Sequence, residues 1–374
     1  MVANFTNNLL KEGTSSKSGE TIAEILDFYG SSLILNSERD RATVGFYCLE
    51  KHLDALLPLL EEILKSPTFP EEEVEMHASR QKQEFEVNLQ KVGYLASRRF
   101  NEMLFGPNHP YGKSASFEDY DLIQRSHLTD FWSQYYHAGN CDIIISGGHQ
   151  DLLIPKLEHH LGGNDWIREH NHTKITIDPD FTFESGDYIV KGDAVQSAIR
   201  MGKPMVMQSH PDFATLKVLN TLLGGYFGSR LMKNIREDNG FTYGINSMLL
   251  SFERAGCLVI ASEVGAGHAG ETIAEIIKEI DILRTIPVSN TELNLVKNYM
   301  LGNFIRSVDG PFDAAEKFKD SLMMGLPNDY YSNYLETVQH TSPQVIMEKA
   351  NEYLVPASFM ELIVGQEDIK KIKN

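Results

Sequence analysis

Apolar residues recur at helical spacing along much of this chain and alternate in short runs between the helical segments. The segment Ser18–Tyr29 is apolar at every third or fourth position, with Ser18 before it and Gly30 after it, which predicts a capped amphipathic helix. The same spacing predicts a helix over His52–Ser66 in spite of Pro58, and a longer one from Glu71 to about Gln90. Shorter apolar runs at 31–36, 42–49 and 141–146 predict strands.

The second half of the chain repeats this order of elements. We expect helices over 212–223 and up to Asn239, strands over 242–251 and 256–264, a helix over 268–284 and a long helix up to Ser307. Two segments of similar sequence begin at His52 and His268, and two more contain Tyr135 and Tyr353, so the offset is 216 in one case and 218 in the other. A nearly constant offset predicts that one unit has been duplicated.

We therefore predict an α+β fold of two tandem similar αβ domains, each an antiparallel-rich sheet covered by helices on one face. The boundaries that follow are residues 1–165 for the first domain, 166–179 for a linker and 180–374 for the second domain. We also expect the first domain to lack its opening strands.

The composition excludes several classes of function. The formal net charge of −18 argues against nucleic acid and anionic membrane surfaces as partners. No run of 18 apolar residues predicts a membrane span, and the first residues show no signal peptide. We expect a soluble protein, cytoplasmic by default and periplasmic if a signal segment precedes this sequence. Three cysteines in apolar contexts, Cys48, Cys141 and Cys257, are expected to be buried free thiols.

Candidate chemistry lies in the stretch 222–247, where a glycine-rich turn leads into a helix and then a strand. Leu231, Met232 and Ile235 share one helical face, and Gly240 is typical of a left-handed helix cap. Arg236 at the end of this helix and Tyr243 on the following strand can both donate to one oxygen atom. By itself, an Arg and a Tyr at this spacing most often belong to an ordinary helix end and strand.

The longer pattern is more specific. The residues GG-x-x-G-S-R-L, N-x-R-E and G-x-x-Y-G in this stretch resemble the second-domain signature of the pitrilysin/insulinase family of HxxEH zinc metallopeptidases. The resemblance implies two similar αβ domains per chain. It also implies that Arg236 and Tyr243 bind a peptide substrate near the scissile bond, across from a zinc ion held by the other half of the enzyme.

The zinc motif of that family is absent from the matching segment. Its three functional positions correspond to Asn4, Asn7 and Asn8, while Glu84 stands where the third ligand is expected. An amide nitrogen offers no free lone pair, and Asn7 cannot serve as a general base. One remaining carboxylate does not make a zinc site, which requires three or four protein ligands. We therefore expect no metal on this chain, with zinc on a partner chain instead.

These observations favour a non-catalytic subunit of a two-chain peptidase. Such a subunit forms a heterodimer with an HxxEH-containing homologue and donates Arg236 and Tyr243 to the partner's zinc site for hydrolysis of a peptide. Two alternatives share the fold: a structural or assembly subunit with no peptidase role, and a self-associating chain that encloses and binds peptides.

Overall fold

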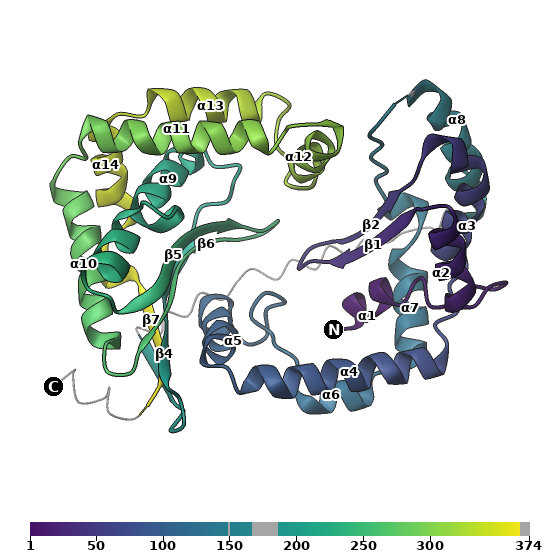
Figure 1. Cartoon of the computed structure of the whole chain (residues 1–374), viewed down its shortest axis with the longest axis horizontal. Coiled ribbons are helices and arrows are strands. Elements are labelled where there is room, and N and C mark those ends of the chain that lie inside the picture. The colour runs from purple at the N-terminus through teal and green to yellow at the C-terminus, as the bar shows by residue number, and fades with distance from the viewer. Residues whose placement is uncertain (149, 167–185, 367–374) are drawn as a thin grey trace. The chain divides into compact units, whose positions relative to one another are not determined.

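The computed structural model describes residues 1–148, 150–166 and 186–366, and they form two compact units (Figure 1). Unit 1 contains the described residues of Met1–Glu86 and Ala115–Thr176, and unit 2 those of Val87–Ser114 and Ile177–Asn374. The predicted linker at 166–179 lies outside the described residues, apart from Trp166. The segment Val87–Ser114 packs with unit 2, although the sequence pattern groups it with the first domain.

Unit 1 consists of helices around a single two-stranded antiparallel sheet in its described part. Its hydrophobic core joins α1, α2, α3, α4 and α7, with Phe5, Leu56 and Leu128 among the fully buried side chains. The elements are α1 (Val2–Asn8), α2 (Gly19–Phe28), β1 (Ser32–Ser37), β2 (Ala42–Tyr47), α3 (Leu53–Lys65), α4 (Glu71–Leu89), α6 (Phe117–Leu122), α7 (Arg125–Tyr135) and α8 (Gln150–Leu161), with short 3-10 turns at Glu50–His52, Ala138–Asn140 and Asn164–Trp166.

Unit 2 is built on a five-stranded sheet in the order β3-β7-β4-β6-β5, antiparallel except between β3 and β7. The elements are α5 (Val92–Phe105), β3 (Gly186–Val190), β4 (Gln196–Met205), α9 (Phe213–Asn220), the π-helices η4 (Thr221–Gly225) and η5 (Met232–Asp238), β5 (Thr242–Ser251), β6 (Gly256–Gly265), α10 (Ala269–Thr285), α11 (Asn290–Arg306), α12 (Pro311–Met323), α13 (Tyr330–His340), α14 (Pro343–Tyr353), the 3-10 turn Pro356–Ser358 and β7 (Met360–Gly365). This architecture confirms the predicted mixture of helices and antiparallel-rich sheet.

The two faces of this sheet are covered by different parts of the chain. Leu258 and Ile260 of β6 face a large core that they form with α9, η4, η5, α10 and α11, whereas Cys257 and Val259 face α5 (Figure 1). Arg200 of β4 holds α5 in place, because its guanidinium donates to the Gly93 carbonyl oxygen at 3.0 Å. Helices were expected on one face only. The apolar side of α5 finds its partner on the opposite face, which its own sequence pattern does not specify.

One predicted strand is wrong in the structure. Residues 141–146 adopt no strand in the described part of unit 1, and Cys141 is exposed where a buried thiol was expected. Cys48 is half-buried and Cys257 is buried. An apolar run of six residues becomes a strand only where a neighbouring strand completes its hydrogen bonds. No strand of the described residues pairs with this segment.

The outer edge of β5 is covered by the segment that precedes it. The Asn220 amide nitrogen donates to the Ser247 carbonyl oxygen at 3.0 Å, and the Ser247 hydroxyl donates to the Asn220 side-chain oxygen at 2.6 Å. The Lys217 ammonium donates to the Leu249 carbonyl oxygen at 3.1 Å. Exposed strand edges attract other strands, so these side chains close an edge that would otherwise pair with another chain.

Gly224 makes this close approach possible. A methyl group at residue 224 would stand 2.7 Å from Cβ and 2.8 Å from the backbone nitrogen of Ser247. Real Cβ atoms do not occupy such positions, so any larger residue would push η4 away from the strand. Gly224 therefore allows η4 to pack directly against β5.

Glu62 of α3 holds the loop between α1 and α2. Its carboxylate accepts hydrogen bonds from the Thr14 hydroxyl at 2.7 Å, from Ser16 and from the Lys17 ammonium. Burial by itself would raise the pKa of Glu62, but the hydrogen bonds from Lys17, Ser16 and Thr14 outweigh it and lower the pKa to about 2. The ionised form is thus bound more strongly in the folded than in the unfolded chain.

We predict that Glu62→Gln reduces the stability of unit 1 at pH 7 by roughly 2 kcal/mol. Because the folded pKa of Glu62 lies below the ordinary 4.5, its stabilisation is present above that pH and is lost as the pH falls toward 2. The difference between wild type and variant should shrink over that interval. Urea unfolding followed by tryptophan fluorescence reports on unit 1, because Trp132 and Trp166 are the two tryptophans of the chain. Glu24→Gln, at an exposed site of α2, should show no such trend.

We predict that Gly224→Ala destabilises unit 2 by about 1–3 kcal/mol, the usual effect of overpacking a well-packed core. Thermal unfolding measures the loss, and hydrogen exchange should show faster opening of the β5 amides. Gly302→Ala in α11 is the matched control, since no atom lies within 4 Å of its added methyl group. That control should be neutral or stabilising, by up to about 1 kcal/mol. Equal stability of the Gly224→Ala variant and wild type would contradict the packing role.

Candidate functional site

Asn7, which the resemblance places at the position of the family's general base, is fully buried. Its amide nitrogen donates to the Asn36 carbonyl oxygen at 2.9 Å and makes a longer contact of 3.5 Å with that of Thr43. Asn36 and Thr43 face each other across the β1–β2 hairpin. The Asn7 side-chain oxygen accepts from the Tyr136 hydroxyl at 3.0 Å. Asn7 therefore connects α1, the hairpin and the end of α7.

The phenol of Tyr136 suits this arrangement, because burial raises its pKa and keeps it protonated. The neutral Tyr136 hydroxyl donates its hydrogen to an acceptor, here the Asn7 side-chain oxygen. The Asn7 amide nitrogen in turn donates its hydrogens to acceptors, here the hairpin carbonyl oxygens. A carboxylate at residue 7 has no hydrogen to donate. An asparagine at this position can therefore both donate and accept, whereas an ionised glutamate can only accept.

The two histidine positions of the motif are also occupied by amides that interact with each other. The Asn8 amide nitrogen donates to the Asn4 side-chain oxygen at 3.1 Å, as residues one helical turn apart can do. Glu84 of α4 is exposed, with a long 3.4 Å contact from Gln81. Across the described residues, no group of three or more His, Cys, Asp or Glu side chains is placed to hold a metal ion.

His77 of α4 is buried beside α1, with its ring edge-on to Phe5 at a centroid distance of 4.7 Å. Burial, and secondarily the Arg80 charge, lowers its pKa. The neutral ring then accepts at Nδ1 from the Arg80 guanidinium at 3.1 Å. His77 is thus a core residue of unit 1, and the described surroundings give it no second imidazole with which to share a metal ion.

Arg236 lies near the end of η5, and the local structure follows the predicted pattern. Leu231, Met232 and Ile235 are buried on one face, which confirms the predicted amphipathic helix. Gly240 has a φ of +69°, as expected of a left-handed cap. A π-helix is rare and occurs preferentially at functional sites.

Tyr243 projects from a bulge at the beginning of β5. Thr242 pairs with Val264 of β6, and the next pair is Ile245 with Ser262, so β5 carries one extra residue here. The bulge is held by the Thr242 hydroxyl, which donates to the Glu263 carbonyl oxygen at 2.7 Å. The Tyr243 side chain is 91% exposed as a result.

Neither side chain has a polar partner in the described part of the chain. No hydrogen bond or ion pair joins the Arg236 guanidinium or the Tyr243 phenol to another described residue. The contact that Arg236 makes is with Phe227, whose ring centroid lies 4.7 Å from the guanidinium carbon. Sequence reasoning missed Phe227, although an aromatic residue inside a glycine-rich turn is a signal that could have drawn attention to it.

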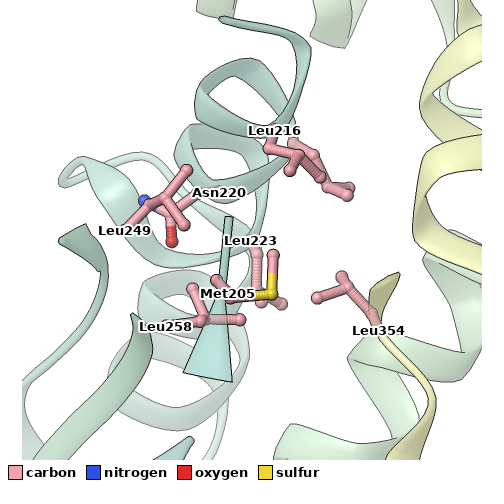
Figure 2. A pocket seen from close by; sticks show the side chains of 8 residues that line it. Met205, Leu216, Asn220, Leu223, Leu249, Leu258 and Leu354 are labelled. Atoms are coloured by element: carbon pink, nitrogen blue, oxygen red, sulfur yellow. The ribbon is translucent and has the colours of Figure 1, made fainter. Parts of the chain in front are cut away.

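A small cavity of about 10 Å³ inside unit 2 is not a ligand site. Figure 2 shows leucine and methionine side chains converging on it from α9, η4 and the sheet, with Asn220 as the one polar residue. The Asn220 side chain is already hydrogen-bonded to Ser247. The volume is at the lower limit for one water molecule, so the cavity is a packing defect.

Comparisons with known proteins identify the family to which the chain belongs. A model of the insulinase family (peptidase family M16) matches residues 2–104, and a model of the peptidase M16 inactive domain matches residues 123–300. The uncharacterized zinc protease YmxG of Bacillus subtilis is 24% identical over 327 residues, which covers 87% of this chain and 78% of that protein. The non-peptidase homolog YmxG of Helicobacter pylori is 22% identical over 365 residues, covering 94% and 81%.

Solved structures show the same fold. A peptidase M16 inactive domain from Pseudomonas fluorescens superposes with a TM-score of 0.84 at 22% identity, covering 98% of this chain and 88% of that one. A protease from Helicobacter pylori gives 0.86 at 18% identity, covering 97% and 89%. The chain belongs to the M16 peptidase family. None of the helices in the described ranges has the length and apolar character needed to cross a membrane.

We predict that Asn7→Asp destabilises unit 1 by about 2–4 kcal/mol, because a buried carboxylate would face the hairpin carbonyls without a hydrogen to donate. Urea unfolding followed by tryptophan fluorescence measures the change. Asn4→Asp keeps the oxygen that accepts from Asn8 and places an acid in the first turn of α1, so it should be nearly neutral. Comparable stability of the two variants would show that Asn7 is not a structural residue.

Proposed function

We propose that this chain is a non-catalytic subunit of a two-chain M16-type peptidase. In this proposal, unit 2 donates Arg236 and Tyr243 to the zinc site of a homologous partner chain that carries HxxEH. The two chains together hydrolyse a peptide, and this chain holds no metal of its own.

The observation that carries the proposal is that two strong donors, the exposed Tyr243 and the half-buried Arg236, have no polar partner among the described residues. An arginine without an ion pair and a tyrosine that is 91% exposed contribute little to the stability of unit 2. The bulge at Thr242–Ile245 and the capped π-helix place both side chains around a single chain reversal. A π-helix and a β-bulge that present hydrogen-bond donors without partners are typical of a binding site.

The chemistry available to these residues is hydrogen-bond donation to oxygen. The Arg236 guanidinium offers five N–H donors, and the Tyr243 phenol offers one O–H donor. Both suit a peptide carbonyl oxygen, and they suit the oxyanion that forms when the carbonyl is attacked even better. Zinc bound by the partner would supply the activated water and polarise the same carbonyl group.

The amide substitutions support a division of labour between two chains. Asn4 and Asn8 bond to each other, and Asn7 is committed to the β1–β2 hairpin and Tyr136. A peptidase that uses Arg236 and Tyr243 must therefore obtain zinc and its general base from another chain. The matched relatives include proteins described as zinc proteases and one described as a non-peptidase homolog.

A second function, assembly without a peptidase role, is favoured by the surface of α12. No residue of this helix is buried, and Phe318 and Leu322 are 55% and 44% exposed on one side of it. Exposed apolar residues grouped on a helix suit association with another protein. In this alternative Arg236 and Tyr243 have no role in catalysis.

We predict that Arg236→Ala or Tyr243→Phe lowers the peptidase activity of the reconstituted pair by about 2–4 kcal/mol of transition-state stabilisation, the usual effect of losing one oxyanion donor. The measurement is kcat/KM for a peptide substrate after mixing the chain with an HxxEH homologue. Assembly, followed by size-exclusion chromatography, should be unchanged.

Arg306→Ala is the matched control, because this arginine of α11 is hydrogen-bonded to Asn303 one turn away. It should leave both activity and assembly unchanged. If the pair cleaves equally well with both Arg236 and Tyr243 replaced, the donated-site function is wrong and assembly remains. If no activity arises although the two chains assemble, the same conclusion follows.

A further inference from the structure

The aromatic ring of Phe227 lies against the guanidinium of Arg236, and it is the feature of this region that the proposed function does not use. Phe227 is 64% exposed, so most of its ring is not buried in the core of unit 2. The guanidinium carbon is 4.7 Å from the ring centroid, well inside the 6 Å range of a cation–π contact. An exposed phenylalanine in this position requires a reason other than core packing.

The turn that carries Phe227 is fixed on both sides. Before it, the Tyr226 ring packs on Tyr299 of α11 at a centroid distance of 4.9 Å. After it, the Arg230 guanidinium makes a two-pronged contact with the Glu292 carboxylate, at 2.8 and 2.9 Å. Both anchors reach α11, so the short turn between them offers Phe227 a well-defined position. Gly228 permits this geometry, since a methyl group there would stand 2.8 Å from the Tyr226 ring.

The kind of contact matters for what Arg236 can bind. A carboxylate partner would occupy the N–H groups of the guanidinium and neutralise its charge. An aromatic ring contacts the flat face instead and leaves the N–H groups at the rim available. Arg236 makes no hydrogen bond with any described residue, in keeping with such an arrangement. The ring can therefore restrict the orientation of the guanidinium without competing with a ligand.

We propose that Phe227 is a positioning residue, whose ring orients the Arg236 guanidinium so that its N–H groups are presented to a peptide carbonyl oxygen. This inference rests on the proposed function for the nature of the ligand. It goes beyond that function in assigning a role to the glycine-rich turn. Phe227 does not donate to the substrate itself, and its effect passes through Arg236.

The contact can be tested in the isolated chain, without any partner. In wild type, the δ-methylene protons of Arg236 should show an upfield ring-current shift in NMR spectra. Phe227→Leu should abolish the shift, and Phe227→Trp should retain it. Identical Arg236 shifts in wild type and Phe227→Leu would overturn the proposal, whether or not the pair is a peptidase.

The functional consequence is tested with the reconstituted pair. Phe227→Leu should lower kcat about 2- to 5-fold, which corresponds to the strength of an exposed cation–π contact, while KM changes much less. Phe227→Trp should restore kcat. Phe28→Leu, at a ring at the end of α2 with 82% exposure, is the matched control and should have no effect.

The dependence on Arg236 separates this inference from the proposed function. In an Arg236→Ala background, Phe227→Leu should cause no further loss, because the ring acts only through the guanidinium. An equal loss in both backgrounds, or no loss in either while Arg236→Ala alone is strongly impaired, would overturn the positioning role and leave the proposed function standing. If Arg236→Ala alone has no effect, the proposed function fails and the catalytic part of this inference fails with it.

Discussion

The close contact between Gly224 and Ser247 is the constraint on which the candidate site of unit 2 depends. It allows η4 to lie directly on the edge of β5, where Asn220 and Ser247 exchange two hydrogen bonds. From this fixed point the chain continues through the Phe227 turn and η5 to Gly240 and back into β5. The positions of Arg236 and Tyr243 thus follow from one packed strand edge, because each end of the intervening segment is bound to the same strand.

Unit 1 shows how a catalytic position can become a structural one. The glutamate that the resemblance places at this position only accepts hydrogen bonds when ionised, whereas an asparagine is one methylene shorter and both donates and accepts. Asn7 uses both abilities, since it bonds the hairpin carbonyls on one side and Tyr136 on the other. The buried amide then stabilises the fold where a carboxylate would oppose it. Loss of the motif and conservation of the helix are thereby physically compatible.

The candidate site residues of the two units differ in whether their side chains have hydrogen-bond partners within the chain. In unit 1, the side chains at the motif positions bond to the chain itself. In unit 2, the two donors make no polar contact with any described residue, and one of them rests on an aromatic ring. This contrast is the physical basis for assigning the binding role to unit 2.

Much of this was predictable from local sequence. The spacing of Leu231, Met232 and Ile235, the cap at Gly240 and the helix 53–65 with its internal proline all appear in the structure as expected. The family was recognisable from the glycine-rich turn and the residues after it. These features depend on the residues themselves or on neighbours within a few positions.

Other features were decided only by the tertiary structure. Residues 141–146 have a strand's composition but no described strand beside them, and α5 packs on the far face of the unit 2 sheet. The hydrogen bonds of Asn7 and the ring beneath Arg236 likewise join residues that the sequence alone does not bring together. A local pattern records which side of a segment is apolar. It does not record which distant surface that side will meet, because that depends on how all the segments pack at once.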